Sequence, residues 1–316
     1  QPALQTAGNN VARFDHNPDT GESLGLLIEE SRTNLLDYSE DFSQWTTFSS
    51  TITSDIIIAP DGTQTGYQIF SNTDTNTHGV SNTLNFTSGN SYTFSVFAKQ
   101  GTQKYLVLSL PSAAFSTEKK GGVDLSNGSV ITGSNSSTQV TDVGNGWYRV
   151  SISATATSTV TSNPSIYLND ADDITVFITG SDTDNLFIWG AQVEQTNNTS
   201  YISFPTSYIK TTGSTVTRSA EEGNIDVDNW FNQNEGTFYV NANTTRANGN
   251  PRILSNASNW VATFMNVTGG TAGVSFNKVS TYDGTNALST STATKIGEYF
   301  KAVTQYNTTS KSALID

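Results

Sequence analysis

The strongest indication of the fold is the run Tyr92-Thr93-Phe94-Ser95-Val96-Phe97-Ala98-Lys99. Apolar residues stand at alternate positions, which is the period of a β-strand with one face buried. The same period recurs at residues 148–152, whereas residues 104–110 and 186–194 are apolar on both faces, as in central strands. Gly- and Asn-rich turns separate the runs. The pattern predicts an all-β chain with a jelly-roll β-sandwich.

Composition divides the chain into four segments. Residues 1–33 form a polar arm, and residues 34–204 form the block that is richest in expected strands. Residues 205–228 are a connector rich in Thr, Ser and Gly, and residues 229–316 begin a second strand series, which we expect to form a partial β-sandwich. The one stretch with helical spacing is residues 29–42, for which we expect one or two turns.

The chain is acidic and poor in charge. Its 316 residues include 28 acidic and 15 basic side chains, a formal net charge of −13, and only 14% of the residues are charged. A surface of this sign repels a polyanion, so we expect no nucleic-acid partner. No apolar run approaches the ~20 residues of a spanning helix, so we expect no membrane partner. The absence of cysteine excludes disulfides and thiolate metal sites.

A series of motifs runs from the arm into the connector. The first comprises Val11-Ala12-Arg13-Phe14-Asp15 and Thr20-Gly21-Glu22-Ser23-Leu24-Gly25-Leu26-Leu27-Ile28-Glu29-Glu30-Ser31-Arg32-Thr33-Asn34-Leu35-Leu36. Further motifs are Gly146-Trp147-Tyr148-Arg149-Val150, Trp189-Gly190-Ala191-Gln192-Val193-Glu194 and Thr215-Val216-Thr217-Arg218. Together, over about residues 11–222, they resemble virion proteins of tailed bacteriophages, found in head-fibre, tail-fibre and tail-spike chains. Residues 229–316 resemble the first half of a concanavalin-A-like or laminin-G-like sandwich.

The resemblance implies a carbohydrate-binding-module-like jelly roll in a virion structural protein. Such a protein would be assembled in the host cytoplasm, exposed on the particle surface, and associated with other virion proteins of the capsid or tail. A homotrimer and attachment to a host-surface glycan are expected by analogy with fibres. The alternatives are a capsid decoration protein, an accessory module of a polysaccharide-degrading spike, and a bacterial surface adhesin.

We do not expect an enzyme. The two histidines, His16 and His78, lie in polar, turn-like sequence, and no G-x-S-x-G nucleophile motif occurs. We expect His78 to pack or to form hydrogen bonds. Carboxylate pairs for glycoside hydrolysis stay formally open, but among 28 acidic residues some pair is expected by chance.

No cofactor is required, although a structural calcium ion is one hypothesis. Asp170, Asp172 and Asp173 form a dense acidic cluster, and carboxylate oxygens are the ligands that Ca²⁺ prefers. The spacing is not that of an EF-hand, so the alternative is a solvated acidic loop.

Glycan binding would need exposed aromatic rings beside polar side chains. Trp45, Trp147 and Trp189 lie within the strand motifs and are expected in the core. The candidates for surface positions are Tyr67, Tyr105 and Tyr167 in the first block and Trp260 in the second.

The arm is expected to dock within its own subunit or between subunits, because a solitary strand is unstable. In either case its charged side chains would be structural salt-bridge partners. These side chains are Arg13, Asp15, Glu29, Glu30 and Arg32.

Overall fold

The computed structural model describes residues 4–8, 10–17, 20–196, 204–223, 232, 234–243, 266–268, 278–282, 287–289, 299–307 and 311–315. The chain forms two compact units, one of residues 1–199 and 203–223 and the other of residues 200–202 and 224–316. Most of the arm and the first part of the connector therefore belong to the first unit. The predicted all-β class is confirmed.

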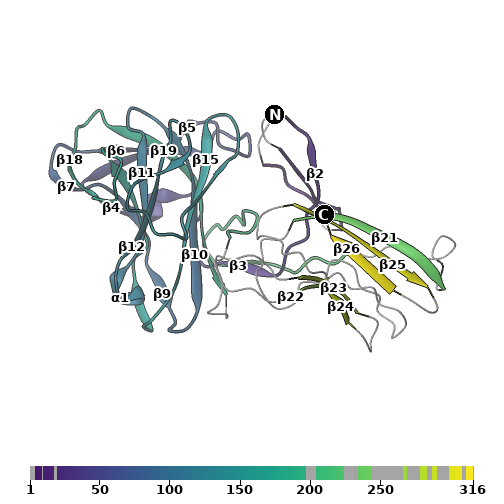
Figure 1. The fold of residues 1–316 in the computed structure, drawn as a ribbon. Coiled ribbons are helices and arrows are strands. Elements are labelled where there is room, and N and C mark those ends of the chain that lie inside the picture. Colours follow the sequence, from purple (N-terminus) through teal and green to yellow (C-terminus); the bar gives the residue numbers. More distant parts are fainter. Residues whose placement is uncertain are drawn as a thin grey trace. The chain divides into compact units, whose positions relative to one another are not determined.

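One sheet of the first unit has six antiparallel strands in the order β14-β15-β10-β19-β6-β5; all of them except β14 are labelled in Figure 1. We call it the front sheet. Residues 92–99 lie in its central strand β10, which pairs with β15 and β19 along almost its whole length. The strands are β5 (Ser50–Ile57), β6 (Gly66–Ser71), β10 (Ser91–Gln100), β14 (Gln139–Asp142), β15 (Trp147–Thr155) and β19 (Asn185–Thr196).

The other sheet, the back sheet, also has six antiparallel strands, in the order β13-β12-β11-β17-β8-β4. The chain crosses repeatedly between the two sheets, from β10 to β11, from β13 to β14, and from β15 through β17 to β19, which makes a jelly roll. The strands are β4 (Thr46–Phe48), β8 (Gly79–Ser81), β11 (Tyr105–Leu110), β12 (Lys119–Asp124), β13 (Ser129–Val130) and β17 (Ser165–Asn169).

The core lies between the two sheets and follows from the period-two pattern. Side chains that alternate along the central strands point inward and are completely buried, as in Phe94, Val96, Leu106, Leu108 and Ile166. A second apolar cluster lies on the outer face of the front sheet, around Phe97, Trp147 and Trp189. This outer cluster needs a cover, and the arm and connector provide it.

Short elements complete the first unit. The helices in its described residues are α1 (Ser112–Phe115) and the 3₁₀ turn η1 (Phe42–Gln44). No helix in the described part of the chain is long and apolar enough to cross a membrane. Four two-stranded sheets are described besides the sandwich. Their pairs are β1 (Phe14–His16) with β2 (Ser23–Leu26), β3 (Arg32–Asn34) with β20 (Val216–Arg218), β7 (Thr75–Thr77) with β18 (Phe177–Thr179), and β9 (Leu84–Phe86) with β16 (Val160–Ser162).

The helix expected within residues 29–42 is wrong. Those residues hold the strand β3, and the 3₁₀ turn begins only at Phe42. Leu35, within this stretch, donates its backbone N–H to the Val193 carbonyl at 2.8 Å. Backbone pairing with a neighbouring strand has overridden a weak local preference.

The second unit contains two three-stranded antiparallel sheets in its described residues, as expected of a partial β-sandwich. One has the order β21-β25-β26 and the other β22-β23-β24. The strands are β21 (Glu235–Ala242), β22 (Asn266–Thr268), β23 (Lys278–Tyr282), β24 (Ala287–Ser289), β25 (Phe300–Asn307) and β26 (Lys311–Ile315).

Candidate functional site

A one-residue bulge in β19 sets the chemistry of the outer face of the front sheet. Ser95 of β10 pairs with Gln192, but Phe97 pairs with Trp189, so β19 uses one residue more than β10 over this interval. The extra residue is accommodated at Gly190, whose φ of +61° lies in the left-handed region that suits glycine. The bulge resets the alternation, so that Gln192 follows Trp189 on the outer face.

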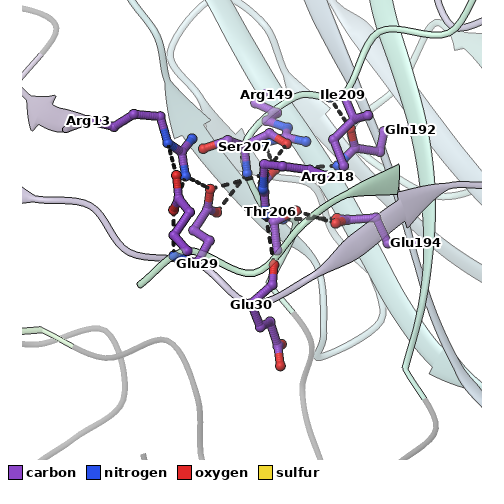
Figure 2. Close-up of polar contacts among 11 residues, drawn as sticks. Arg13, Glu29, Glu30, Arg149, Gln192, Glu194, Thr206, Ser207, Ile209 and Arg218 are labelled. Carbon is purple, nitrogen blue, oxygen red and sulfur yellow. Dashed lines mark hydrogen bonds and ion pairs between the residues drawn. The ribbon is translucent and has the colours of Figure 1, made fainter. Parts of the chain in front are cut away.

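Residues 204–211, here called the strap, lie against this outer face and hold its polar side chains (Figure 2). The Gln192 side-chain carbonyl accepts the Ile209 N–H at 2.7 Å, and Glu194 accepts the Thr206 N–H at 2.9 Å. The Thr206 hydroxyl donates a short hydrogen bond to the same carboxylate. Both side chains are buried, so these bonds satisfy groups that would otherwise be costly to desolvate.

Arg149 of β15 lies between the front sheet and the strap and contacts both. Its guanidinium donates to the Thr206 carbonyl at 2.6 Å and to the Ser95 hydroxyl at 3.2 Å, and lies 5.1 Å from the centre of the Phe97 ring. Burial lowers the pKa of the Arg149 guanidinium, partly offset by the charge of Glu194. The arginine therefore holds a desolvated positive charge between sheet and strap.

Asn34 joins the arm, the sheet and the strap at one point. Its amide nitrogen donates to the carbonyls of Ala191 and Ile209 at 3.2 and 2.9 Å. Its amide oxygen accepts the N–H groups of Leu36 and Val193 at 3.2 and 3.1 Å. The side chain is completely buried, so four backbone groups depend on it.

An ion network anchors the arm (Figure 2). Arg13 forms ion pairs with Glu29 at 2.7 Å and with Glu221 at 2.5 Å. Glu29 also faces Arg218 at 3.1 Å and accepts the Ser207 N–H at 2.8 Å. Arg13 and Glu29 thus form salt bridges as expected, and they form them within the chain; Arg32 and Glu30 form an ion pair as well. Asp15 instead accepts the backbone N–H of His16.

The motifs that carry the phage resemblance converge on this one assembly of arm, outer sheet face and strap. Their polar groups form hydrogen bonds and ion pairs with one another. We call this assembly the clamp, and its contacts hold the arm and the strap against the sheet. The residues that meet there are Arg13, Glu29, Asn34, Arg149, Gln192, Glu194 and Arg218.

The two carboxylates that pair with Arg13 are shifted toward the charged form. Burial alone would raise the pKa of Glu29, but hydrogen bonds from Arg13 and Ser207 hold it below its ordinary value of 4.5. Burial likewise opposes ionisation of Glu221, and the hydrogen bond from Arg13 outweighs it, so its pKa is also lowered from 4.5. A group whose folded pKa is depressed stabilises the fold above its unfolded pKa and loses that contribution as pH falls through the folded value.

Acid is therefore expected to release the arm while the sandwich stays folded. As the pH falls through the folded pKa values of Glu29 and Glu221, which lie below 4.5, protonation removes the charges that pair with Arg13, and the arm loses its anchor. Hydrogen exchange, corrected for intrinsic rates, should show residues 11–17 and 20–31 protected at pH 7, with this protection lost along a pH titration that continues downward from pH 4.5. The amides of β10 are the internal control and should remain protected. Arm protection that persists throughout the titration would contradict the expectation.

Two of the predicted tyrosines lie on one face. Tyr105 of β11 and Tyr167 of β17 come from adjacent strands of the back sheet, and the residues facing them in the register are Asn169 and Val107. Both rings are half-buried against the outer apolar cluster that contains Val107. We call this outer surface of the back sheet the tyrosine face.

Charged and hydroxyl groups flank the two tyrosines. Lys104 lies 4.5 Å from the centre of the Tyr105 ring and pairs with Asp124 at 2.8 Å. Beside Tyr167, the Ser109 hydroxyl donates to Glu118 at 2.7 Å, and burial raises the pKa of the Tyr167 hydroxyl. The face thus combines flat apolar rings with hydroxyl, carboxylate and ammonium groups.

The Tyr167 ring meets Phe48 across a glycine. Gly79 of β8 pairs with Tyr167 on one side and with Phe48 on the other. The two rings approach to 5.5 Å between centres, above a position that has no side chain. The aromatic content of this face therefore includes Phe48, which sequence patterning did not single out.

The other predicted aromatic sites differ in outcome. Tyr67 is buried, packs its ring edge-on to Phe42 and donates its hydroxyl to Asp41 at 2.9 Å, so the expectation of a surface ring there is wrong. Trp260 lies outside the described residues. Trp45, Trp147 and Trp189 are buried as expected, Trp45 between the two sheets and the other two in the outer cluster of the front sheet.

His78 has the structural role expected of it. It is completely buried, and its ring nitrogens lie 2.7 Å from the Ser49 carbonyl and 3.1 Å from the Asp74 carbonyl.

The predicted calcium ligands do not gather. Asp172 accepts the Thr132 N–H, Asp173 accepts the Thr175 N–H, and Asp170 is exposed. The Asn169 amide holds the loop through the carbonyls of residues 171 and 173. Within the described residues no three acidic or histidine side chains form a group suited to a metal ion, so the arrangement does not support the calcium hypothesis.

The second unit presents an aromatic ring that sequence reasoning missed. Tyr239 of β21 is 60% exposed, and the alternation of this strand places Thr237 and Asn241 on the same exposed face. The cross-strand partners of these two residues are Gln305 and Lys301, both exposed. The available signal in the sequence was the alternation of Thr237 and Asn241 with Phe238, Val240 and Ala242, which puts Tyr239 on the polar side.

Comparison with known proteins adds little. The chain matches no family model and no curated protein. One similar solved structure holds the CBM22-1 and GH10 modules of the endo-1,4-β-D-xylanase 10B of Clostridium thermocellum with xylohexaose; it is 16% identical, with a TM-score of 0.31, over 57% of this chain and 30% of that one. Another is the CBM22-2 xylan-binding domain of Paenibacillus barcinonensis Xyn10C, 12% identical, with a TM-score of 0.31, over 52% of this chain and 98% of that one. Likenesses this slight support no functional argument, and the jelly-roll assignment rests on the sheet order.

Proposed function

We propose that this chain is a non-enzymatic structural protein of a bacteriophage particle, which binds host-surface glycan through the tyrosine face. The placement on a particle rests on the resemblance of its motifs to virion proteins. The observation that carries glycan binding is that Tyr105 and Tyr167 lie on one outer sheet face.

The tyrosine face has the chemistry that a sugar needs. Aromatic rings offer flat apolar surface to the C–H groups of a pyranose, while nearby hydroxyl and charged groups exchange hydrogen bonds with its hydroxyls. The ion pairs of Lys104 with Asp124 and of Lys120 with Glu118 balance their charges locally. An uncharged glycan suits this face better than a polyanion, which the net charge of −13 would repel.

The test is binding of the fluorescently labelled chain to host cells and to their purified envelope polysaccharide. We expect saturable binding to cells that the polysaccharide competes away. Tyr105→Ala and Tyr167→Ala should each weaken binding about tenfold or more, as expected for an aromatic residue at the centre of a contact. Tyr239→Ala is the matched control, because it removes an exposed aromatic ring from the second unit.

The outcomes separate the candidate functions. Loss of binding only in Tyr239→Ala would overturn the tyrosine face while preserving glycan attachment. An absence of binding by protein of confirmed fold would favour the capsid decoration role, for which the exposed apolar surface of the arm is the favouring observation. Release of sugar from the polysaccharide would contradict the non-enzymatic proposal and favour a spike module.

A further inference from the structure

The turn between β14 and β15 holds one of the three Asn-Gly pairs of the chain. Asn145 and Gly146 have positive φ values of +56° and +74°, and the Trp147 N–H donates to the Gly144 carbonyl at 3.0 Å. Two successive positive φ values are typical of a type I′ hairpin turn, for which Asn-Gly is a preferred pair. Both residues are exposed, so water and base reach the peptide bond that joins them.

An Asn-Gly pair can react with itself. The peptide nitrogen of the glycine, once it has lost its proton to base, attacks the side-chain carbonyl carbon of the asparagine. The new C–N bond closes a succinimide ring, and the side-chain nitrogen takes up a proton and leaves as ammonia. Water then opens the ring at either carbonyl and gives aspartate or isoaspartate. Glycine favours the attack because it has no side chain to obstruct the approach.

The Lys99 ammonium is placed to promote this attack at Asn145. Its Nζ donates to the Asn145 backbone carbonyl at 2.5 Å. A Cβ atom placed on Gly146 would lie 3.6 Å from the same Nζ, so the ammonium lies beside the reacting peptide bond. When the Gly146 nitrogen loses its proton, its negative charge is shared with the Asn145 carbonyl oxygen, where the charge-assisted hydrogen bond stabilises it. The lysine therefore makes the nucleophile easier to form.

The pair formed by Asn127 and Gly128 is restrained by its own contacts. The Gly128 N–H donates to the Asp124 carbonyl at 2.8 Å. The side-chain oxygen of Asn127 accepts the Ser129 N–H, also at 2.8 Å. Both groups that would have to react are thus held in hydrogen bonds, which the attack would break.

The reacting groups of Asn145 and Gly146 are not restrained in this way. Within the described part of the chain, neither the Asn145 side-chain amide nor the Gly146 N–H has a hydrogen-bond partner. The side chain can therefore rotate toward the peptide nitrogen without losing a contact. The third pair, Asn248-Gly249, lies outside the described residues.

We propose that Asn145 is a self-modification site, which converts to aspartate and isoaspartate in the folded protein much faster than Asn127. The product carries a carboxylate in place of the amide, next to the Lys99 ammonium. Isoaspartate also lengthens the backbone of the turn by a methylene group. Strand β14 lies at the edge of its sheet and pairs with β15 alone, so a lengthened turn should loosen β14 first.

The test is the rate of conversion in the full chain, kept folded in mildly alkaline buffer and digested with trypsin at intervals. Lys120 and Arg149 bound one tryptic peptide that contains both asparagines, and its fragmentation in a mass spectrometer assigns each change from amide to acid. We expect Asn145 to convert about tenfold faster than Asn127 or more. In denaturant, where the folded contacts are absent, the two rates should be similar. Equal rates in the folded chain would overturn the proposal.

Variants at position 99 test the role of the ammonium. Lys99→Met removes the charge and should slow the conversion of Asn145 about fivefold or more, whereas Lys99→Arg keeps the charge and should preserve the rate. The control is Lys119→Met, which removes an ammonium that donates to Thr117 instead and should leave the rate unchanged. An unchanged or faster rate in Lys99→Met would overturn the promoting role of the lysine.

The aged protein gives a second readout. Hydrogen exchange should rise in β14 more than in β10 as Asn145 converts, and the variant Asn145→Gln, whose longer side chain does not form the succinimide, should show no such rise. A rise of the same size in Asn145→Gln would contradict the assignment of the change to this turn. Polysaccharide binding by the aged chain should equal that of fresh protein, because the turn belongs to the front sheet and the tyrosine face to the back sheet. Failure of this proposal is therefore distinct from failure of the proposed function.

Discussion

Replacing Gly79 with alanine is expected to destabilise the first unit by about 3 kcal/mol or more, which is large against a typical total stability of 5–15 kcal/mol. A Cβ atom placed on Gly79 would lie 2.0 Å from the carbonyl oxygen of Ile166 and 3.1 Å from the Cα of Tyr167. Both contacts are with backbone in the neighbouring strand β17, so no side chain can rotate away. The back sheet would have to separate where β8 pairs with β17.

Chemical denaturation of Gly79→Ala, followed by tryptophan fluorescence, measures this loss. The matched control is Gly89→Ala. Gly89 also has a positive φ, of +87°, but its added Cβ would meet no atom within 4 Å, so only the backbone strain of about 1–2 kcal/mol applies. Equal losses in the two variants would show that the close approach of β8 and β17 is not what requires glycine at position 79.

Asn34→Ala is expected to cost about 3–5 kcal/mol. The substitution leaves the N–H groups of Leu36 and Val193 and the carbonyls of Ala191 and Ile209 without the partner that each now has. Each buried group that loses its partner costs about 1–3 kcal/mol, reduced where water enters. Because two of these groups lie in β19 and one in the strap, the strap should loosen together with the arm.

Thermal unfolding and hydrogen exchange together test this expectation. Exchange should rise at the amides of Val193 and Ile209 more than in β11, which Asn34 does not touch. The neighbouring variant Thr33→Ala is the control. It removes an exposed hydrogen bond to Thr217 and should change stability by no more than about 0.5 kcal/mol. A loss in Asn34→Ala as small as in Thr33→Ala would contradict the central role of the buried amide.

The sandwich could be predicted from sequence because its information is local. The alternation in residues 92–99 is enough to define an inward and an outward face. The burial of Trp45, Trp147 and Trp189 was expected because they lie within the strand motifs. Tyr67 was misplaced for a related reason. Alternation says which residues share a face of a strand, but not whether another segment covers that face.

The clamp could not be predicted as an assembly, because its members are brought together by non-local pairing. Arg13 and Glu221 are 208 residues apart in sequence. One signal was nevertheless present. Gly190 interrupts an otherwise continuous strand pattern, which often marks a bulge, and a bulge there assigns Gln192 and Glu194 to the outer face.

The pairing of β3 with β20 also determines how the first unit responds to tension. The two strands are antiparallel, and Arg32, where β3 begins, lies opposite Arg218, where β20 ends. A pull on the two ends of the chain therefore reaches this short ladder at residues 31 and 219, at the same end of it, and opens its hydrogen bonds one after another. The ion pairs of Arg13 lie outside that end and would part first. We therefore expect a stretched chain to lengthen by peeling off its arm at low force, while the strands of the sandwich, which such a pull does not yet reach, keep their register.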